Sequence, residues 1–196
     1  LIRWADPEGG LVPPGHFIPL LEETGMILEV GKWVQRQALI DYERWRAAGA
    51  DPVRIAVNVS AVQLRQESFI ADVQKIIADG AGPATALELE ITESLVMEDI
   101  EQNIRKLKAI QELGITIAVD DFGTGYSSLS YIAKLPISAL KIDRSFVVNM
   151  ADSPDSMNIV QTIISLALSL NLKVIAEGVE TTEQEKLLRL LRCTDA

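Results

Sequence analysis

The chain has 196 residues, and its 18 Lys and Arg against 28 Asp and Glu give a formal net charge of −10. With 48% hydrophobic residues it can bury a sizeable core, which excludes a disordered or collagen-like chain. A groove for nucleic acid needs a basic stripe, and the acidic balance argues against one. We therefore expect one globular domain over residues 1–196 and no nucleic-acid duplex among its partners.

No segment of the sequence has the pattern of a membrane or export signal. The longest stretch without a charge, Ser156–Leu172, contains too many polar side chains to cross a bilayer. The first residues lack the basic and apolar regions of a signal peptide. Cys193, the single cysteine, has no partner for an internal disulfide and suits a reducing compartment. We expect no membrane contact within this chain.

Short β-branched runs alternate with amphipathic segments along the chain. A strand stub at Leu1–Trp4 comes first, followed by a helix over Leu28–Ala48 in which we expect Trp33 and Trp45 to pack in the core or against other helices. Later helices have apolar faces at helical spacing, start signals at Ser153-Pro154 and at Thr181 with Gln184, and a C-terminal cap at Gly114. The apolar faces are Ile100, Ile104, Leu107 and Ile110 in one helix, and Ile159, Ile163, Leu166 and Leu170 in the other. The clear strands are Arg54–Val59, Leu87–Thr92, Ile115–Val119, Ala139–Ile142 and Lys173–Ala176.

This alternation predicts an α/β fold with a parallel sheet buried on both faces. A doubly wound dinucleotide fold would need a Gly-x-Gly-x-x-Gly turn, which the sequence does not contain. A (β/α)8-type, TIM-like barrel fits better, because polar residues recur where the strands end. Five clear strands are fewer than eight, so we expect a barrel truncated at both termini in this chain.

Oxygen-bearing side chains follow three of these strands. Asn58, Glu90, Asp120 and Asp121 are hard donors that suit Mg²⁺, Mn²⁺ or Ca²⁺. The adjacent aspartates would repel each other, and a two-metal site would resolve that repulsion. The alternative is that each residue is a helix cap or a solvated loop residue. Phe122–Gly125 then forms either a mobile loop over the site or an ordinary turn.

Two further charged residues stand at strand ends. Lys141 is unusual in an apolar strand and should face the polar mouth, where it could hold the attacking water or the phosphate; the alternative is an exposed lysine on an edge strand. Glu177 follows the last strand and is a candidate metal ligand or general base. Glu180 would support the surrounding structure, or else be an ordinary acid at a helix start.

The motifs jointly resemble those of the EAL-type cyclic di-GMP phosphodiesterases, a bacterial signalling family, over essentially the whole chain. They occur in the family's order and spacing. They are Leu-Ile-Arg-Trp, Pro-Gly-His-Phe-Ile-Pro-Leu-Leu-Glu-Glu-Thr-Gly, Asn-Val-Ser, Glu-Ile-Thr-Glu-Ser, Asp-Asp-Phe-Gly-Thr-Gly, Leu-Lys-Ile-Asp-Arg-Ser-Phe and Glu-Gly-Val-Glu.

The resemblance implies hydrolysis of cyclic di-GMP to linear pGpG at a pair of Mg²⁺ or Mn²⁺ ions. Lys141 then matches the family's water-positioning lysine, and Arg3 matches a contact to the substrate phosphate. Glu93 and Glu180 match acids that brace the active-site loops. The implied metal ligands are Asn58, Glu90, Asp120 and Asp121, with Glu177 as a ligand or base.

The sequence departs from the family at both ends. Leu1 fits the last letter of the Glu-Ala-Leu signature, so the printed sequence contains neither the family's metal-binding glutamate nor the glutamine expected after Ala196. Either flanking sequence supplies these residues or the chain is a fragment. The competing functions are a catalytically silent cyclic di-GMP receptor and a dimerisation module. The resemblance also implies a homodimer, flanking sensory or cyclase domains, and a cytoplasmic location with possible tethering to the inner membrane.

Overall fold

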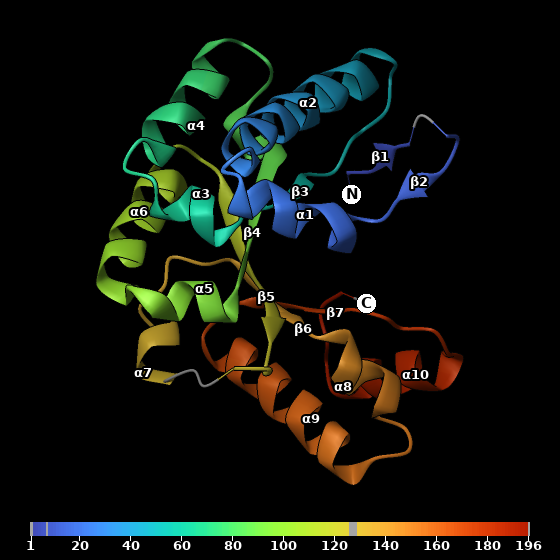
Figure 1. The fold of residues 1–196 in the computed structure, drawn as a ribbon. Coiled ribbons are helices and arrows are strands. Elements are labelled where there is room, and N and C mark those ends of the chain that lie inside the picture. Colours follow the sequence, from blue (N-terminus) through green and yellow to red (C-terminus); the bar gives the residue numbers. More distant parts are fainter. Residues whose placement is uncertain (1, 7, 126–128, 196) are drawn as a thin grey trace. The chain divides into compact units, whose positions relative to one another are not determined.

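The computed structural model describes residues 2–6, 8–125 and 129–195 (Figure 1). These residues form two compact units, Leu1–Leu89 with Glu112–Ile115 and Glu90–Gln111 with Thr116–Ala196. The expectation of one domain stays a prediction. The strands are β1 (Trp4–Ala5), β2 (Leu11–Val12), β3 (Ile55–Asn58), β4 (Leu87–Thr92), β5 (Thr116–Phe122), β6 (Ala139–Ile142) and β7 (Lys173–Ala176). The helices are α1 (Pro14–Glu23), α2 (Ile27–Ala47), α3 (Ala61–Arg65), α4 (Phe69–Ala78), α5 (Glu93–Glu98), α6 (Ile100–Glu112), α7 (Leu129–Ile132), α8 (Arg144–Asn149), α9 (Pro154–Ser169) and α10 (Thr182–Leu190), with a short 3₁₀ turn at Ala84–Ala86.

Five strands form one sheet in the order β3-β4-β5-β6-β7. The pairs β5-β6 and β6-β7 are parallel, with Lys141 of β6 opposite Ile175 of β7. Every residue of β6 is buried, because this strand has a neighbour on each side. The bounds of β4, β6 and β7 are those predicted, and the α/β class with parallel strands is confirmed.

Two strands differ from those predicted from the sequence. The strand that starts the chain pairs antiparallel with β2 in a separate two-stranded sheet, so it does not precede β3 in the parallel sheet; Leu1 lies outside the described residues. The strand predicted to end at Val119 continues to Phe122, through a register shift against β6. Asp121 adopts a φ of 53° within this irregular segment, which changes the direction of the chain directly after Asp120.

In the second unit, α9 packs on β6 and β7. Its predicted start is confirmed, because the Ser153 hydroxyl accepts a hydrogen bond from the Ser156 N–H and Pro154 occupies the first turn. Its buried face is offset from the predicted one, since Val160 and Ile164 are buried and Ile159 is exposed. The capping box of Thr181 with Gln184 at the start of α10 is also confirmed.

In the first unit, α2 packs against β3, α3 and α4. Gly31 of α2 lies so close to Gln63 of α3 that an added Cβ would be 2.5 Å from the Gln63 Cδ. Trp33 lies about 200° around the helix from Gly31 and is exposed, as is Trp45. The expectation that these tryptophans pack in the core was therefore wrong.

None of the helices that the structure describes combines the length and the apolar character needed to cross a membrane.

Candidate active site

Three carboxylates converge on the ammonium group of Lys141. The Nζ atom lies 2.6 Å from Glu90 Oε1, 2.6 Å from Glu177 Oε1 and 3.2 Å from Asp120 Oδ1. Lys141 is 7% exposed and lies in the middle of the sheet. The alternative of an exposed lysine on an edge strand is therefore wrong, and these four predicted site residues lie together in the second unit.

The sheet itself brings these side chains together. Glu90 lies in β4, Asp120 near the end of β5, Lys141 near the end of β6, and Glu177 directly after β7. Four neighbouring strands therefore each contribute one charged group at the carboxyl-terminal end of the sheet, where enzymes with parallel sheets place their chemistry. The Glu177 N–H donates to the Ile142 carbonyl at 3.3 Å, which continues the β6-β7 ladder to the site residue.

The charges of the cluster shift the titration of its members. Burial alone would lower the pKa of Lys141, but its hydrogen bonds to Glu177 and Glu90 outweigh burial and raise the pKa. Burial raises the pKa of Glu90 in spite of the pairing with Lys141. Burial, followed by the charge of Asp120, also raises the pKa of Asp121. For Glu90, the pairing with Lys141 therefore does not outweigh the cost of burying its charge.

Asp143 joins this cluster, although sequence reasoning did not single it out. Its carboxylate accepts the Ser145 N–H at 2.9 Å as the N-cap of α8, and its charge adds to burial and to Asp120 in raising the pKa of Asp121. The signal that could have found it is its spacing from Lys141, because residues two apart at the end of a strand point to the same side.

Glu93 holds the loop that follows β5. It is 2% exposed, and its Oε2 accepts the N–H groups of Gly123 at 2.8 Å and Gly125 at 3.2 Å. A Cβ on Gly125 would lie 3.1 Å from the Glu93 carboxyl carbon, so the glycine permits this close approach. These contacts suit the loop-supporting assignment of Glu93. Glu180 forms an ion pair with Arg144, whose side chain lies over Gly178.

Two predicted site residues belong to the first unit. Asn58 is the last residue of β3, and Arg3 directly precedes β1, where its Nη1 donates to the Ile2 carbonyl at 3.0 Å. Their participation in the site stays a prediction.

The donors of the cluster suit hard divalent cations. All are carboxylate oxygens, and neighbouring carboxylates add to burial in raising the pKa values of Glu90 and Asp121. Within residues 2–6, 8–125 and 129–195, no three His, Cys, Asp or Glu side chains are already spaced as a metal cage. Instead, the Lys141 ammonium group is paired with carboxylate oxygens of Glu90 and Glu177 that a metal ion would need.

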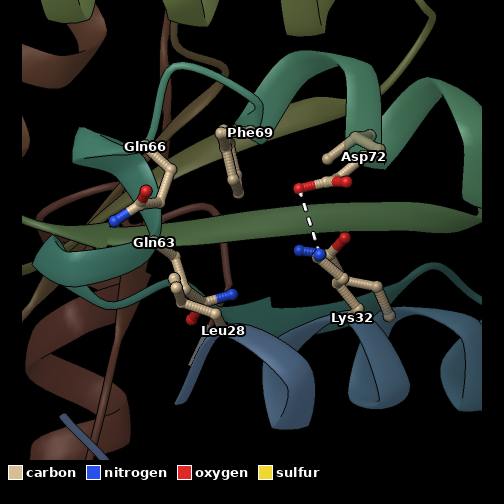
Figure 2. A pocket seen from close by; sticks show the side chains of 8 residues that line it. Leu28, Lys32, Gln63, Gln66, Phe69 and Asp72 are labelled. Atoms are coloured by element: carbon tan, nitrogen blue, oxygen red, sulfur yellow. Dashed lines mark ion pairs between the residues drawn. The ribbon is translucent and has the colours of Figure 1, made fainter. Parts of the chain in front are cut away.

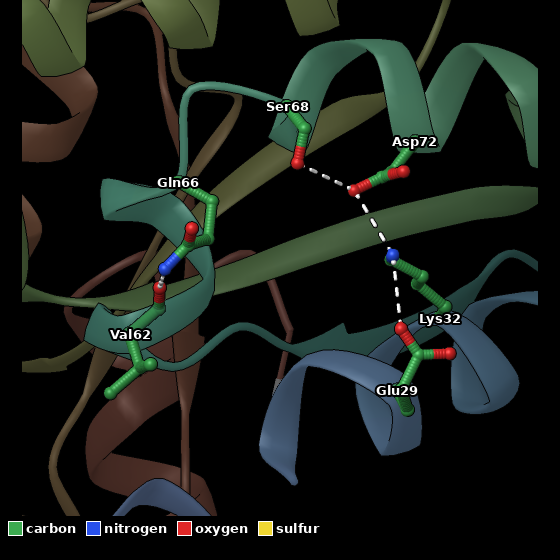
Figure 3. Close-up of polar contacts among 6 residues, drawn as sticks. All are labelled: Glu29, Lys32, Val62, Gln66, Ser68 and Asp72. Atoms are coloured by element: carbon green, nitrogen blue, oxygen red, sulfur yellow. Dashed lines mark hydrogen bonds and ion pairs between the residues drawn. The ribbon is translucent and has the colours of Figure 1, made fainter. Parts of the chain in front are cut away.

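A second lysine cluster lies in the first unit, between α2 and α4. Lys32 pairs with Glu29 at 3.2 Å and Asp72 at 3.3 Å, and Ser68 donates to Asp72 at 3.0 Å (Figure 3). The small pocket beside it has a cavity volume of about 20 Å³, roughly enough for one water molecule (Figure 2). This space cannot hold a nucleotide.

Known proteins match the chain over nearly its whole length. The EAL domain model matches residues 1–195. The chain is 44% identical over 193 residues to the cyclic di-GMP phosphodiesterase NbdA of Pseudomonas aeruginosa, covering 98% of this chain and 25% of NbdA. It is 42% identical to the bifunctional diguanylate cyclase/cyclic di-GMP phosphodiesterase MucR of the same organism, covering 98% of this chain and 28% of MucR.

Solved structures agree with these sequence matches. The structure of the PaMucR phosphodiesterase in complex with c-di-GMP superimposes with a TM-score of 0.94 at 41% identity, over 98% of this chain and 78% of that chain. This similarity confirms the predicted TIM-like barrel class. The chain spans about a quarter of the length of these curated relatives. On these matches, the chain belongs to the EAL domain family.

Proposed function

We propose that this chain is the catalytic part of a divalent-metal-dependent phosphodiesterase that hydrolyses cyclic di-GMP to linear pGpG. The observation that carries the proposal is the buried Lys141 held by Glu90, Asp120 and Glu177 at one edge of the sheet. The relatives named as cyclic di-GMP phosphodiesterases support the substrate.

Asn58, Glu90, Asp120 and Asp121 would hold the metal ions, with Glu177 as a ligand or base. When bound, a pair of Mg²⁺ or Mn²⁺ ions would neutralise charge on the phosphodiester and lower the pKa of a bound water. Lys141 is already paired with three carboxylates, so an anionic substrate would need the metal ions as counter-charge.

Lys141 and Glu177 would divide the handling of the attacking water between them. The raised pKa keeps Lys141 protonated, so it acts as a hydrogen-bond donor that orients the water and not as a base. Glu177 is the most exposed of the three acids that pair with Lys141 and can accept the proton of the water. The water oxygen bonds to phosphorus, the bond from phosphorus to O3′ breaks, and the departing oxygen takes up a proton.

Glu93 would serve catalysis indirectly, by keeping the loop after β5 in place behind Asp120 and Asp121. Arg3 would contact a substrate phosphate. We also propose sensory or cyclase domains outside this chain, since the chain spans only part of its relatives. The homodimer that the family resemblance implies is part of the same proposal.

The test is turnover of cyclic di-GMP by the full-length protein with Mg²⁺, with Mn²⁺ and after exhaustive chelation. We expect pGpG with either ion and none after chelation, measured by chromatography of the products. Undiminished hydrolysis after chelation, or stoichiometric zinc in the purified protein, would contradict the proposal. Tight binding of cyclic di-GMP without turnover under any of these conditions would favour the receptor.

A further inference from the structure

The loop after β7 places Glu177 beside Lys141, and its next residue has an unusual backbone. Gly178 has a φ of 75°, a conformation that other residues rarely adopt. A Cβ at this position would collide with the Arg144 Cγ and lie 2.9 Å from its Cδ. The hydrocarbon part of the Arg144 side chain therefore rests directly on the Gly178 backbone.

The end of the same arginine side chain binds the same loop. Its Nη2 forms an ion pair with Glu180 Oε1, two residues after Gly178. The adjoining turn is also tied to α8, because the Gln184 side-chain Oε1 accepts the Glu180 N–H at 2.8 Å while its Nε2 donates to the Val148 carbonyl at 3.2 Å. Arg144 thus covers the loop with its hydrocarbon part and anchors it with its guanidinium group.

The position of Arg144 in the chain links it to the active site. Arg144 is the first residue of α8 and comes three residues after Lys141, whose Nζ lies 2.6 Å from Glu177 Oε1. The four-residue segment Lys141–Arg144 therefore holds the Glu177 loop at two points. A cation in the first turn of a helix is opposed by the helix dipole, so α8 gains no stability from an arginine there.

We propose that Arg144 is a positioning residue that keeps the Glu177 carboxylate at Lys141 by holding the backbone of Gly178. This inference rests on the proposed function, in which Glu177 handles the proton of the attacking water. The Glu177 side chain is 40% exposed, so its own packing restrains it less than the buried Glu90 is restrained. Without Arg144, the glycine would allow the loop to sample other conformations, and the carboxylate would spend less time in the reactive position.

The test compares Arg144→Ala with Arg144→Lys and with a matched control, Arg189→Ala. Arg189 also forms an exposed ion pair, with Glu185 at 2.6 Å, but that pair lies within α10. We expect Arg144→Ala to lower kcat by about 10- to 100-fold with a KM for cyclic di-GMP within about threefold of wild type. Arg144→Lys, which keeps a hydrocarbon stem and a cation, should recover a large part of that loss. Arg189→Ala should retain the wild-type kcat.

Two further measurements complete the test, and the first does not depend on turnover. Hydrogen exchange of the peptide that contains Glu177–Glu180 should speed up at least about tenfold in Arg144→Ala and stay unchanged in Arg189→Ala. Gly178→Ala, which breaks the same contact from the other side, should lower kcat in the same way. A kcat within twofold of wild type in folded Arg144→Ala, unchanged exchange of the loop, or a loss confined to KM would overturn the inference. An inactive wild type would contradict the proposed function alone, and the exchange measurement would still decide the role of Arg144.

Discussion

Two lysines in this protein each pair with more than one carboxylate, but in different surroundings. Lys32 lies on α2 with its side chain 36% exposed, and its partners Glu29 and Asp72 lie in the same layer of helices (Figure 3). Lys141 lies in the middle of a sheet with its side chain 9% exposed, and its three partners come from three other strands or strand ends. Water screens the first cluster, whereas in the second it reaches Glu177 but scarcely reaches Lys141 and Glu90.

The difference in burial indicates a different role for each cluster. An exposed ion pair contributes at most about 1 kcal/mol to stability, so the cluster around Lys32 is structural and weak. A buried cation surrounded by an excess of acids is expensive to desolvate, and such arrangements concentrate at functional sites. Equivalent changes in the two clusters should therefore affect stability at Lys32 and turnover at Lys141.

The largest expected difference is between Lys141→Met and Lys32→Met. Losing one preorganised electrostatic group typically lowers the rate on the order of 10²–10³-fold, and we expect that loss for Lys141→Met in the full-length protein with Mn²⁺. Lys32→Met should keep the wild-type kcat. Added Mn²⁺ should not rescue Lys141→Met, while Mn²⁺ binding measured by titration calorimetry should be retained. Turnover within threefold of wild type for folded Lys141→Met would rule out its assigned role.

The next comparison tests the acids. Glu90→Gln removes one negative charge from the donor set, so we expect the affinity for Mn²⁺ to fall by at least about tenfold, with partial recovery of turnover in excess Mn²⁺. Asp72→Asn makes the same chemical change beside Lys32 and should leave Mn²⁺ affinity unaltered. Equal Mn²⁺ affinity in Glu90→Gln and wild type would exclude Glu90 as a ligand.

A third pair of variants tests whether the Lys32 region affects stability only. In Gly31→Ala, the new Cβ would displace the Gln63 side chain, whose Oε1 accepts the Ser60 N–H at 3.1 Å in a capping box. We expect the free energy of unfolding in urea to fall by about 1–3 kcal/mol with kcat unchanged. Gly15→Ala is the control, because nothing lies within 4 Å of a Cβ at Gly15. That change should raise stability by about 0.4–1 kcal/mol, and a stabilised Gly31→Ala would disprove the close packing.

The smallest expected effect is that of Lys32→Met on stability, a loss below about 1 kcal/mol at neutral pH. The hydrogen bond to Glu29 raises the pKa of Lys32 above its ordinary value of 10.5, burial partly opposes this, and Asp72 adds to it. A raised pKa in the folded state stabilises the protein below the unfolded pKa, and this contribution is lost as the pH rises through the folded pKa. The difference between wild type and variant should therefore be constant from pH 7 to about 9 and shrink above about 10.5. A difference that grows with pH would contradict the pairing.

Much of the sheet was predictable from the sequence. The bounds of β4 follow from a short run in which Leu and Ile alternate with polar residues, and those of β6 and β7 from short, mostly apolar runs, as expected for strands buried on both faces. The same rule made Lys141 conspicuous, since a lysine in such a run needs partners. The convergence of Glu90, Asp120 and Glu177 with Lys141 was predictable because parallel neighbouring strands end at the same end of a sheet, but their direct pairing with Lys141 was not predicted.

Other features depended on the tertiary structure. The charge interaction between Asp121 and Asp143, and the contact of Arg144 with Gly178, bring together segments whose mutual approach no local pattern encodes. The exposure of Trp33 could not be predicted either, because composition alone does not tell which side of α2 faces its neighbours. Local sequence determines where strands and helices form, through backbone propensity, caps and apolar periodicity, whereas the packing of distant segments decides which charges meet and how deeply they are buried.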